Sequence, residues 1–302
     1  MAVILEVSLS DLNRIALAQD SLYKCFPKKI EKDGKTKERW VERPQPQLRR
    51  IQRRIVMLLD RIQPPDYLHS GYRGRSYITN ARRHDPKARL VKIDIRKFFP
   101  SAYAGYVYRS FVDEFQCSHD VAGVMARLTT AFGHLPTGGN SSTSISFFAF
   151  KSMFDEINRL AISRGLVMSC CVDDMTFSGP SATEGFLNEV RIIVRKFGLK
   201  THKRHCFEPH QTKVVTGVAL TPNGIRLPNA RRKKVHLAFK DFDAETDLKV
   251  KVKAGERLLG RATEAAQVEE AFRPLVNAAA VRLNDAKRQL RRSKSRVCIL
   301  NG

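Results

Sequence analysis

Three aspartates have residue types and neighbours suited to metal-dependent chemistry. Asp94 stands in an apolar run, and Asp173 and Asp174 stand side by side between two other short apolar runs. Adjacent carboxylates in a tight, apolar turn repel each other, and a divalent cation removes that cost. Mg²⁺ takes hard oxygen ligands, usually one or two carboxylates together with phosphate and water oxygens. Two such ions about 4 Å apart can activate a hydroxyl group and stabilise a leaving group in an in-line displacement.

Two predicted strand regions must position these acids. The run ARLVKIDIRKFF, residues 88–99, alternates apolar and polar residues as a buried strand does. The run GLVMSCCVDDMTFSG, residues 165–179, predicts two short strands joined by a tight turn that carries the acidic pair. An exposed turn, in which Asp-Asp is simply favourable turn chemistry, is the alternative interpretation of the pair. A third acid, Asp94, in a strand followed by Phe98 and Phe99 favours the metal site.

The rest of the chain predicts a basic helical and hairpin lobe, a mixed α/β centre and a basic helical tail. In the first lobe, Asp33-Gly34 is a strong hairpin-turn signal between short strand-like runs. Two or three short strands are expected before about Ile225, and a basic helical segment from Arg231. The spacing of apolar residues predicts helices over about 8–24, 46–62, 103–130, 144–164 and 182–198.

The charge balance indicates the kind of partner. Lys and Arg number 54 against 30 Asp and Glu, which gives a net charge of +24 and a pI near 10.1. This surplus predicts a polyanionic partner, and nucleic acid is the default because neutralised phosphates release counterions. A merely soluble basic protein is the alternative. A membrane surface is disfavoured, since no basic amphipathic helix with an aromatic face is evident.

The cysteines and the N-terminal run predict a cytoplasmic chain with no membrane partner. The six cysteines show no disulfide spacing, so a reduced protein is expected. The start MAVILEV lacks the basic region and the cleavage site of a signal peptide. No apolar run approaches the roughly 18 residues of a membrane span. A zinc site is a minor alternative whose spacing matches no finger or ribbon pattern; its ligands would be Cys170, Cys171, His202, His205 and Cys206.

Several motifs together resemble the retron family of bacterial reverse transcriptases. IDIRKFFPS, LPTGGNSSTS and CVDD resemble motifs A, B and C of reverse transcriptases, in the right order and spacing. NARRH at 80–84 and VTG at 215–217 resemble the NAxxH and VTG signatures of retron enzymes. KTKERWVERPQPQLRRIQ resembles their fingers motif, and the resemblance covers roughly residues 24–235.

The resemblance implies an α+β right-hand polymerase with fingers, an antiparallel-sheet palm and a short helical thumb. Residues 1–88 would form N-terminal helices and fingers, and residues 229–302 a basic helical thumb that binds RNA. Residues 89–228 would form the palm with motifs A to D, with part of the fingers inserted at about 103–140. The length leaves no room for an RNase H or endonuclease domain, so template removal is expected to depend on a separate enzyme.

The resemblance also implies roles for single residues. Asp94, Asp173 and Asp174 would be the catalytic acids, and together with the carbonyl of Ile95 they would hold two Mg²⁺ ions. The incoming dNTP would contact residues of three motifs: Lys37, Arg39, Phe99, Thr137 and Gly138. Among these, the aromatic residue of motif A would be a steric gate against the sugar 2′-hydroxyl, with core packing as its alternative. Lys37 and Arg39 would bind the triphosphate. The alternative interpretation of these two residues is a solvated basic hairpin. Gly138 and Gly139 would let the backbone approach the nucleotide closely.

Some positions depart from the family pattern. Cys171 replaces the usual aromatic residue before the acidic pair, Thr137 replaces the Gln of motif B, and Ser142-Thr143 replaces its Ser-Pro end. GLKTHKRHC aligns with GLKxNxxKT, whose Lys is a candidate general acid for pyrophosphate. His205 occupies that position here, and Lys203 lies two residues before it, so both are candidate general acids. These changes affect the expected rate and fidelity, not the reaction class.

RNA contacts are expected at two places. Asn80 and His84, four residues apart, would have a structural role near the RNA or the palm. The basic tail at 282–296 would grip an RNA stem, with a solvated helix face as its alternative. Its RNA-binding residues would be Arg288, Arg291, Arg292 and Lys294.

By resemblance, the expected function is RNA-directed DNA synthesis in a retron. The partners would be a structured non-coding RNA that serves as template and primer, dNTPs, the RNA–DNA hybrid called msDNA, and an effector protein of an anti-phage defence system. Another defence-associated or group II intron-like reverse transcriptase without msDNA is one alternative, and a catalytically weak RNA-binding scaffold is another. Phe99 argues against a third, an RNA-dependent RNA polymerase.

Overall fold

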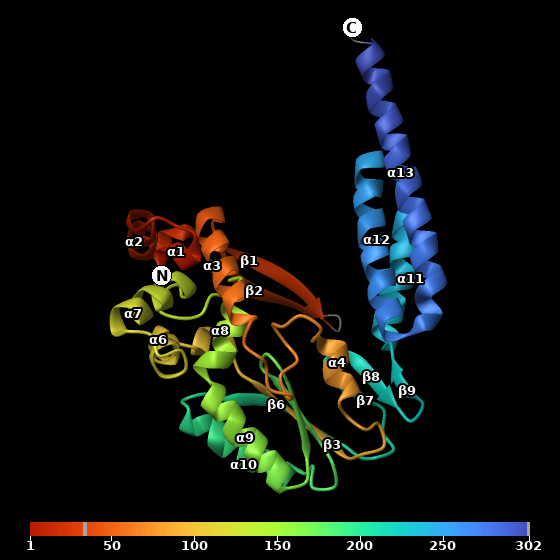
Figure 1. Ribbon diagram of the computed structural model, residues 1–302. Coiled ribbons are helices and arrows are strands. Elements are labelled where there is room, and N and C mark those ends of the chain that lie inside the picture. The colour runs from red at the N-terminus through yellow and green to blue at the C-terminus, as the bar shows by residue number, and fades with distance from the viewer. Residues whose placement is uncertain (33–34, 301–302) are drawn as a thin grey trace. The chain divides into compact units, whose positions relative to one another are not determined.

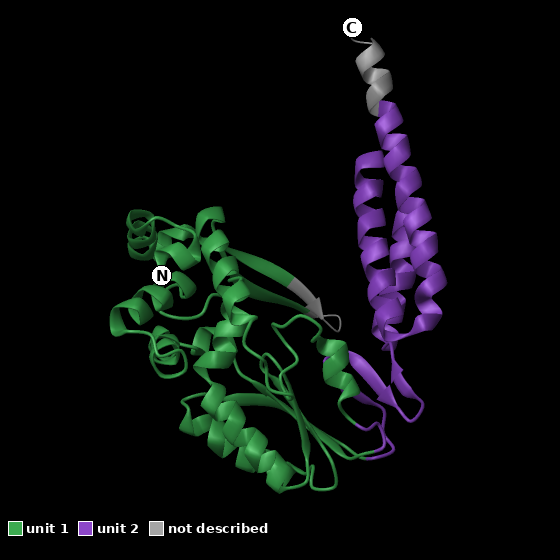
Figure 2. Ribbon diagram, in the orientation of Figure 1, with its two compact units in different colours: residues 1–84, 88–208 green, residues 85–87, 209–302 purple. Residues whose placement is uncertain are grey.

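The computed structural model describes the backbone of residues 1–32 and 35–300, and the side chains of residues 1–29 and 36–293. The predicted turn at Asp33-Gly34 therefore lies outside the described residues. The chain forms two compact units, shown in green and purple in Figure 2. The first unit contains residues 1–84 and 88–208, and the second contains residues 85–87 and 209–302. The division into fingers, palm and thumb stays a prediction.

A four-stranded antiparallel sheet forms the centre of the first unit, in the order β4-β5-β3-β6 (Figure 1). Its strands are β3 Leu90–Ile95, β4 Val167–Cys171, β5 Asp174–Ser178 and β6 Thr201–Phe207. One face is apolar and buried, with Ile93, Met175 and Phe177 pointing into the core. Helices α9 and α10 pack on this face, where the rings of Phe177 and Phe186 meet edge-on at 4.9 Å. The other face carries polar side chains, because successive residues of a strand alternate between faces.

A long antiparallel hairpin and the N-terminal helices complete the first unit. The hairpin consists of β1 Tyr23–Lys32 and β2 Lys35–Pro44, so its strands are longer than the short runs expected from the sequence. Amphipathic helix α3 follows it and buries Leu48, Ile51 and Ile55. The helical elements of this unit are α1 Ala2–Leu5, α2 Leu9–Leu17, η1 Gln19–Leu22, α3 Pro46–Leu59, α4 Tyr77–Arg82, α5 Phe98–Ser101, α6 Ala104–Asp113, α7 His119–Thr129, α8 Ser142–Ala149, α9 Lys151–Ser163 and α10 Glu184–Lys196.

Three predicted helices are shorter than expected or are divided. The helix predicted over 8–24 ends at Leu17, because β1 begins at Tyr23 and its pairing with β2 takes over. The pattern over 103–130 forms two helices, separated where Gln116 adopts a left-handed backbone with φ 51°. The pattern over 144–164 is divided at Phe150, whose backbone leaves the helical region at φ −126° and ψ 22°. Periodicity persists through such breaks, so it cannot locate them.

The second unit combines a small sheet with three long helices. Its elements are β7 Lys213–Val215, β8 Val218–Thr221, β9 Gly224–Arg226, α11 Asn229–Ala244, α12 Leu248–Val268, η2 Glu270–Phe272 and α13 Arg273–Leu300. The three strands are antiparallel in the order β7-β8-β9. The helices share a core rich in alanine, which lets their backbones approach closely: Ala238, Phe242, Ala254, Leu258, Ala262, Ala279 and Ala286. The predicted helical tail is confirmed. Among the described helices, none combines the length and the apolar character needed to span a bilayer.

Candidate active site

The central sheet brings the three predicted acids together. Asp94 on β3 lies directly opposite Asp174 on β5, and opposite residues of antiparallel strands project from the same face. Asp173 lies in the turn between β4 and β5, where its carbonyl accepts a hydrogen bond from the Ile95 N–H at 3.0 Å. The side chain of Ile95 is fully buried, and the metal contact of its carbonyl stays a prediction.

The turn that carries Asp173 is strained and is held by a neighbouring segment. Val172 has φ 62°, a left-handed conformation that is unusual for a β-branched residue. Its N–H donates to Oγ of Ser70 at 3.0 Å. The same segment runs beside β4, since His69 N–H donates to the Cys170 carbonyl at 2.8 Å. Ser70 could not be predicted from the sequence, because a serine in a loop carries no signal of this contact.

The acids lie in a partly buried, negatively charged environment. Burial, and then the nearby Asp94 carboxylate, raise the pKa of Asp173 to about 6. Burial also raises the pKa of Asp174, although the Lys92 ammonium 3.7 Å away works in the opposite direction. Carboxylate oxygens are hard donors of the kind that Mg²⁺ prefers.

The described ligand groups are compatible with a cation that substrate and water help to bind. Within the part of the chain that the structure describes, no three His, Cys, Asp or Glu side chains are grouped so that they alone could hold a metal ion. A Mg²⁺ site built on one or two carboxylates and completed by phosphate and water oxygens fits this arrangement. The predicted zinc ligands are dispersed: Cys170 is buried in the core, whereas Cys206 is exposed.

Strand β6 brings an imidazole and an ammonium group to Asp94. The pairing of β3 with β6 shifts register between Lys92 and Asp94, and Lys203 has φ 52°, as expected at a β-bulge. The two consecutive residues His202 and Lys203 therefore both reach one carboxylate. His202 Nε2 lies 2.5 Å from Oδ1 of Asp94, and Lys203 Nζ lies 3.1 Å from Oδ2.

The two candidate general acids thus lie in different places. Lys203 contacts Asp94, whereas His205 is exposed and its ring stacks on Phe207 with centroids 6.1 Å apart. Sequence analysis considered His202 only as a zinc ligand. The available signal was its place at the Asn of the GLKxNxxKT motif.

The NAxxH signature lies against the polar face of the same sheet. His84 bridges two strands, with Nδ1 2.7 Å from Oγ of Ser178 and Nε2 2.7 Å from Oγ of Ser169. Burial lowers the pKa of His84 to about 3, so the ring is neutral. Asn80 is fully buried on α4. Both side chains are surrounded by protein here, and their direct contact with RNA stays a prediction.

The two hairpin cations share one face of the hairpin. Arg39 lies directly opposite Lys28. Lys37 stands two residues before Arg39 and therefore projects from the same face. Both predicted residues are exposed. Arg43 extends this face, and its guanidinium lies over the ring of Phe26 at 5.3 Å. We call Lys28, Lys37, Arg39 and Arg43 the cationic face; Lys28 and Arg43 were not predicted.

The motif B residues contact the hairpin directly. The Thr137 N–H donates to Oε2 of Glu42 at 2.8 Å. Gly138 has φ 132°, and a Cβ there would lie 3.0 Å from the Glu42 carbonyl oxygen and from Val41. The protein's own strand thus requires this glycine, whereas sequence analysis assigned it to the approach of a nucleotide. Phe99 is partly buried beside Phe98, with ring centroids 6.1 Å apart, and its role as a gate stays a prediction.

The second unit holds the VTG signature and the predicted RNA-binding arginines. Gly217 has φ 83°, and the Arg231 guanidinium occupies the place that a side chain at this position would need. Lys294 lies outside the described side chains. On α13, three predicted residues are exposed: Arg288, Arg291 and Arg292.

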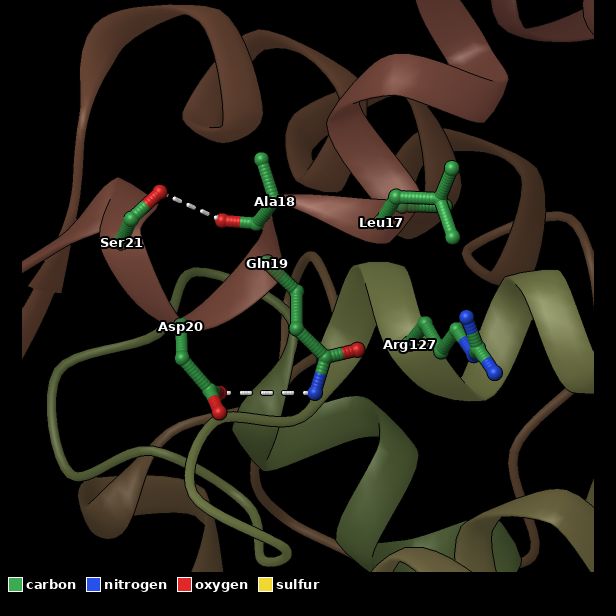
Figure 3. Close-up of a pocket in the computed structure, with 7 residues that line it drawn as sticks. Leu17, Ala18, Gln19, Asp20, Ser21 and Arg127 are labelled. Atoms are coloured by element: carbon green, nitrogen blue, oxygen red, sulfur yellow. Dashed lines mark hydrogen bonds between the residues drawn. The ribbon is translucent and has the colours of Figure 1, made fainter.

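A separate hollow of about 430 Å³ lies in the first unit, where η1 follows α2 (Figure 3). Gln19, Asp20 and Arg127 are among its lining residues, and Gln19 Nε2 donates to Asp20 at 3.4 Å. None of the three candidate catalytic acids lines this hollow.

No protein-family model matches the chain. Curated relatives do match it: the retron Se72 reverse transcriptase of Salmonella heidelberg is 29% identical over 232 residues, which is 72% of this chain and 60% of the relative. The retron Ec86 reverse transcriptase of Escherichia coli is 24% identical, over 77% of this chain and 75% of the relative. The chain resembles retron reverse transcriptases. It spans about half to three quarters of the length of these relatives, and the retron Mx162 enzyme of Myxococcus xanthus marks the lower end at 48%.

Solved structures agree with this retron resemblance at the level of fold. Two structures of the RNA-dependent RNA polymerase of a human picorbirnavirus, one with an insertion loop deleted, each match with a TM-score of 0.52. They are 11% and 12% identical and cover 90% and 87% of this chain, and 65% and 55% of the viral chains. Identity this low shows the fold alone. The retron-like chain therefore has a right-hand polymerase-like α+β fold.

Proposed function

We propose that the chain is the RNA-directed DNA polymerase of a retron, and that it copies a structured non-coding RNA into msDNA. The observation that carries this proposal is the pairing of Asp94 with Asp174 on the central sheet, beside Asp173 in its turn. The resemblance to retron reverse transcriptases supports DNA as the product. Phe99, as a gate against the 2′-hydroxyl, supports the same choice.

The three acids would hold two Mg²⁺ ions together with the carbonyl of Ile95. These ions would supply activation of the primer hydroxyl and stabilisation of the leaving pyrophosphate. His202 and Lys203 orient Asp94 through its two oxygens, and the Lys203 ammonium is the better placed of the two predicted groups to give a proton to pyrophosphate.

The cationic face of the hairpin would bind the nucleotide triphosphate. Its four Lys and Arg side chains offer charge-assisted hydrogen bonds to phosphate oxygens. Glu38 and Glu42 lie on the opposite face, so neither acid opposes this contact. Thr137 and Gly138, in the motif B loop that contacts the hairpin, would bind the same nucleotide.

The second unit would serve as the thumb and grip the RNA. The exposed arginines on α13, together with Lys294, favour binding to an RNA backbone. The basic character of the segment 229–302 and the net charge of +24 of the whole chain favour the same partner. Residues 1–88 would act as fingers and 89–228 as palm. The msDNA product and an effector protein of a cytoplasmic anti-phage defence system complete the proposal.

Primer extension on an RNA template tests the reaction. We expect Mg²⁺-dependent incorporation of dNTPs and not of NTPs. Asp173→Asn should lower the rate more than about 100-fold, because it removes a charged metal ligand, while RNA affinity stays unchanged. Asp113→Asn is the matched control, since Asp113 is an exposed aspartate at the end of α6. Equal activity in Asp173→Asn would overturn the site assignment.

The nucleic acid that copurifies with the protein separates the remaining possibilities. A branched species sensitive to both RNase and DNase supports the retron. Extension without such a species supports an intron-like or other defence-associated reverse transcriptase. RNA binding without any extension supports a scaffold, and extension with NTPs supports an RNA polymerase.

A further inference from the structure

Glu42 is a buried acid at the point where strand β2 meets the motif B loop, residues 135–144. Its side chain is only 9% exposed. The carboxylate accepts two hydrogen bonds, from the Thr137 N–H at 2.8 Å and from Nε2 of His134 at 3.1 Å. The backbone N–H of Glu42 donates in return to the Thr137 carbonyl at 3.1 Å. Two hydrogen bonds therefore join Glu42 to Thr137, and His134 adds a third contact to the same carboxylate.

Two further contacts attach the same loop to the same hairpin. Gly138 packs so closely on the Glu42 carbonyl that no side chain fits without displacement. The Asn140 N–H donates to Gln52, which in turn donates to the hydroxyl of Tyr23, the first residue of β1. Buried and partly buried hydrogen bonds thus attach the loop at two places, to the hairpin directly and through Gln52.

The position of Glu42 on β2 links this attachment to the cationic face. Arg39 and Lys37 lie three and five residues before Glu42 on the same strand, or about 10 and 17 Å along it. Their side chains project from the opposite face of the strand, so they remain exposed while Glu42 is buried. Any shift of the hairpin relative to the loop has to break the contacts of Glu42.

We propose that Glu42 is a positioning residue that couples the β1–β2 hairpin to the motif B loop, so that both segments bind the incoming nucleotide as one surface. The inference rests on the proposed function and deepens it. A carboxylate suits this role because each of its two oxygens accepts a hydrogen bond from a different donor. A glutamine offers one accepting oxygen, and its amide nitrogen would face a second donor.

Steady-state kinetics with Glu42→Gln tests the proposal. The KM for dNTP should rise about tenfold, because one charge-assisted hydrogen bond is lost, while kcat changes less than about twofold. Glu38→Gln is the matched control, since Glu38 is an exposed acid on the same face of the same strand, and it should leave both constants unchanged. His134→Ala removes only one of the two donors and should raise the KM by about threefold.

Each outcome decides the proposal. An unchanged KM in Glu42→Gln overturns it. A rise in KM that comes with a comparable fall in kcat and in thermal stability also overturns it, because that result would indicate a purely structural role. If Glu42→Gln does not fold, an unchanged KM in His134→Ala overturns the proposal instead. The proposed function fails separately, namely if neither the unmodified protein nor Glu38→Gln extends a primer with dNTPs.

Discussion

Nε2 of His202 lies 2.5 Å from Oδ1 of Asp94, and the next residue in the chain contacts the other oxygen of the same carboxylate. Consecutive residues of a regular strand project to opposite faces, so this double contact requires the β-bulge at Lys203. The bulge places two hydrogen-bond donors beside Asp94 within a strand that is otherwise largely exposed.

Substitutions along β6 should separate the residues that act on Asp94 from the one that does not. Lys203→Met and His202→Ala should each lower the rate of single-nucleotide extension by about tenfold or more, because each removes a donor that holds the carboxylate. His205→Ala should change the rate less than about twofold, because His205 lies opposite Lys92 on β3, whereas His202 and Lys203 contact Asp94 directly.

Pre-steady-state extension assays measure these rates, and thermal melting of each variant checks that the fold is intact. If His205→Ala reduces the rate more than Lys203→Met does, the geometric assignment is wrong and His205 is the general acid that the motif alignment indicates.

The buried ring of His84 should make stability depend on pH. Burial, followed by the positive charge of Arg83, lowers the pKa of His84 from 6.5 to about 3. The unfolded chain therefore binds a proton at a higher pH than the folded protein does. Stability is complete above pH 6.5 and is lost as the pH falls toward 3. As the pH falls from 6.5 to about 5, protonation of His84 in the unfolded chain should lower the free energy of unfolding by about 2 kcal/mol.

Chemical denaturation at a series of pH values measures this dependence against His84→Gln. A glutamine offers both a donor and an acceptor to Ser169 and Ser178 but does not titrate in this range. His69, whose pKa burial lowers to about 4, titrates in both proteins, so its contribution cancels in the difference apart from its charge interaction with His84. Identical slopes for the two proteins would contradict the assignment of a neutral, buried ring.

Lys213 should be essential for the stability of the second unit. Its fully buried ammonium donates to three carbonyls, those of Pro86 at 2.6 Å, Pro209 at 2.8 Å and Gln211 at 3.2 Å. These bonds attach the short segment 85–87 to this unit. Lys213→Met leaves three acceptors without this donor and should lower the free energy of unfolding by about 3 kcal/mol.

Thermal or urea unfolding of the whole chain measures this loss. Lys233→Met, at an exposed position of α11, is the control and should stay within about 0.5 kcal/mol of the unmodified protein. A similar stability of the two variants would show that the three carbonyls find other donors, such as water.

Local sequence patterns predicted the structural features that depend on residues close together in the chain. The strand of Asp94, the acidic turn and the apolar stripe of α3 were all predictable, because alternation and helical periodicity depend on residues that are close in the chain. Breaks within periodic segments were not predictable. Phe150 divides two helices although the apolar pattern continues through it.

The contacts of the residues around the acids could not be predicted from local sequence patterns. Ser70, Glu42 and His202 act through partners that lie far away in the chain, so neighbouring residues do not show these contacts, although His202 stands at the Asn of the GLKxNxxKT motif. The role of Gly138 was likewise visible only once the β2 backbone lay against it.

The sequence by itself determined the positive charge, the three candidate acids and the retron-like motifs, because these depend on residue type and spacing alone. The tertiary structure decided which donors reach Asp94, what holds the strained turn at Val172, and that the motif B loop is bound to the hairpin. These are contacts between distant segments, and they depend on strand register and on a single bulge that no alternation of residue types records.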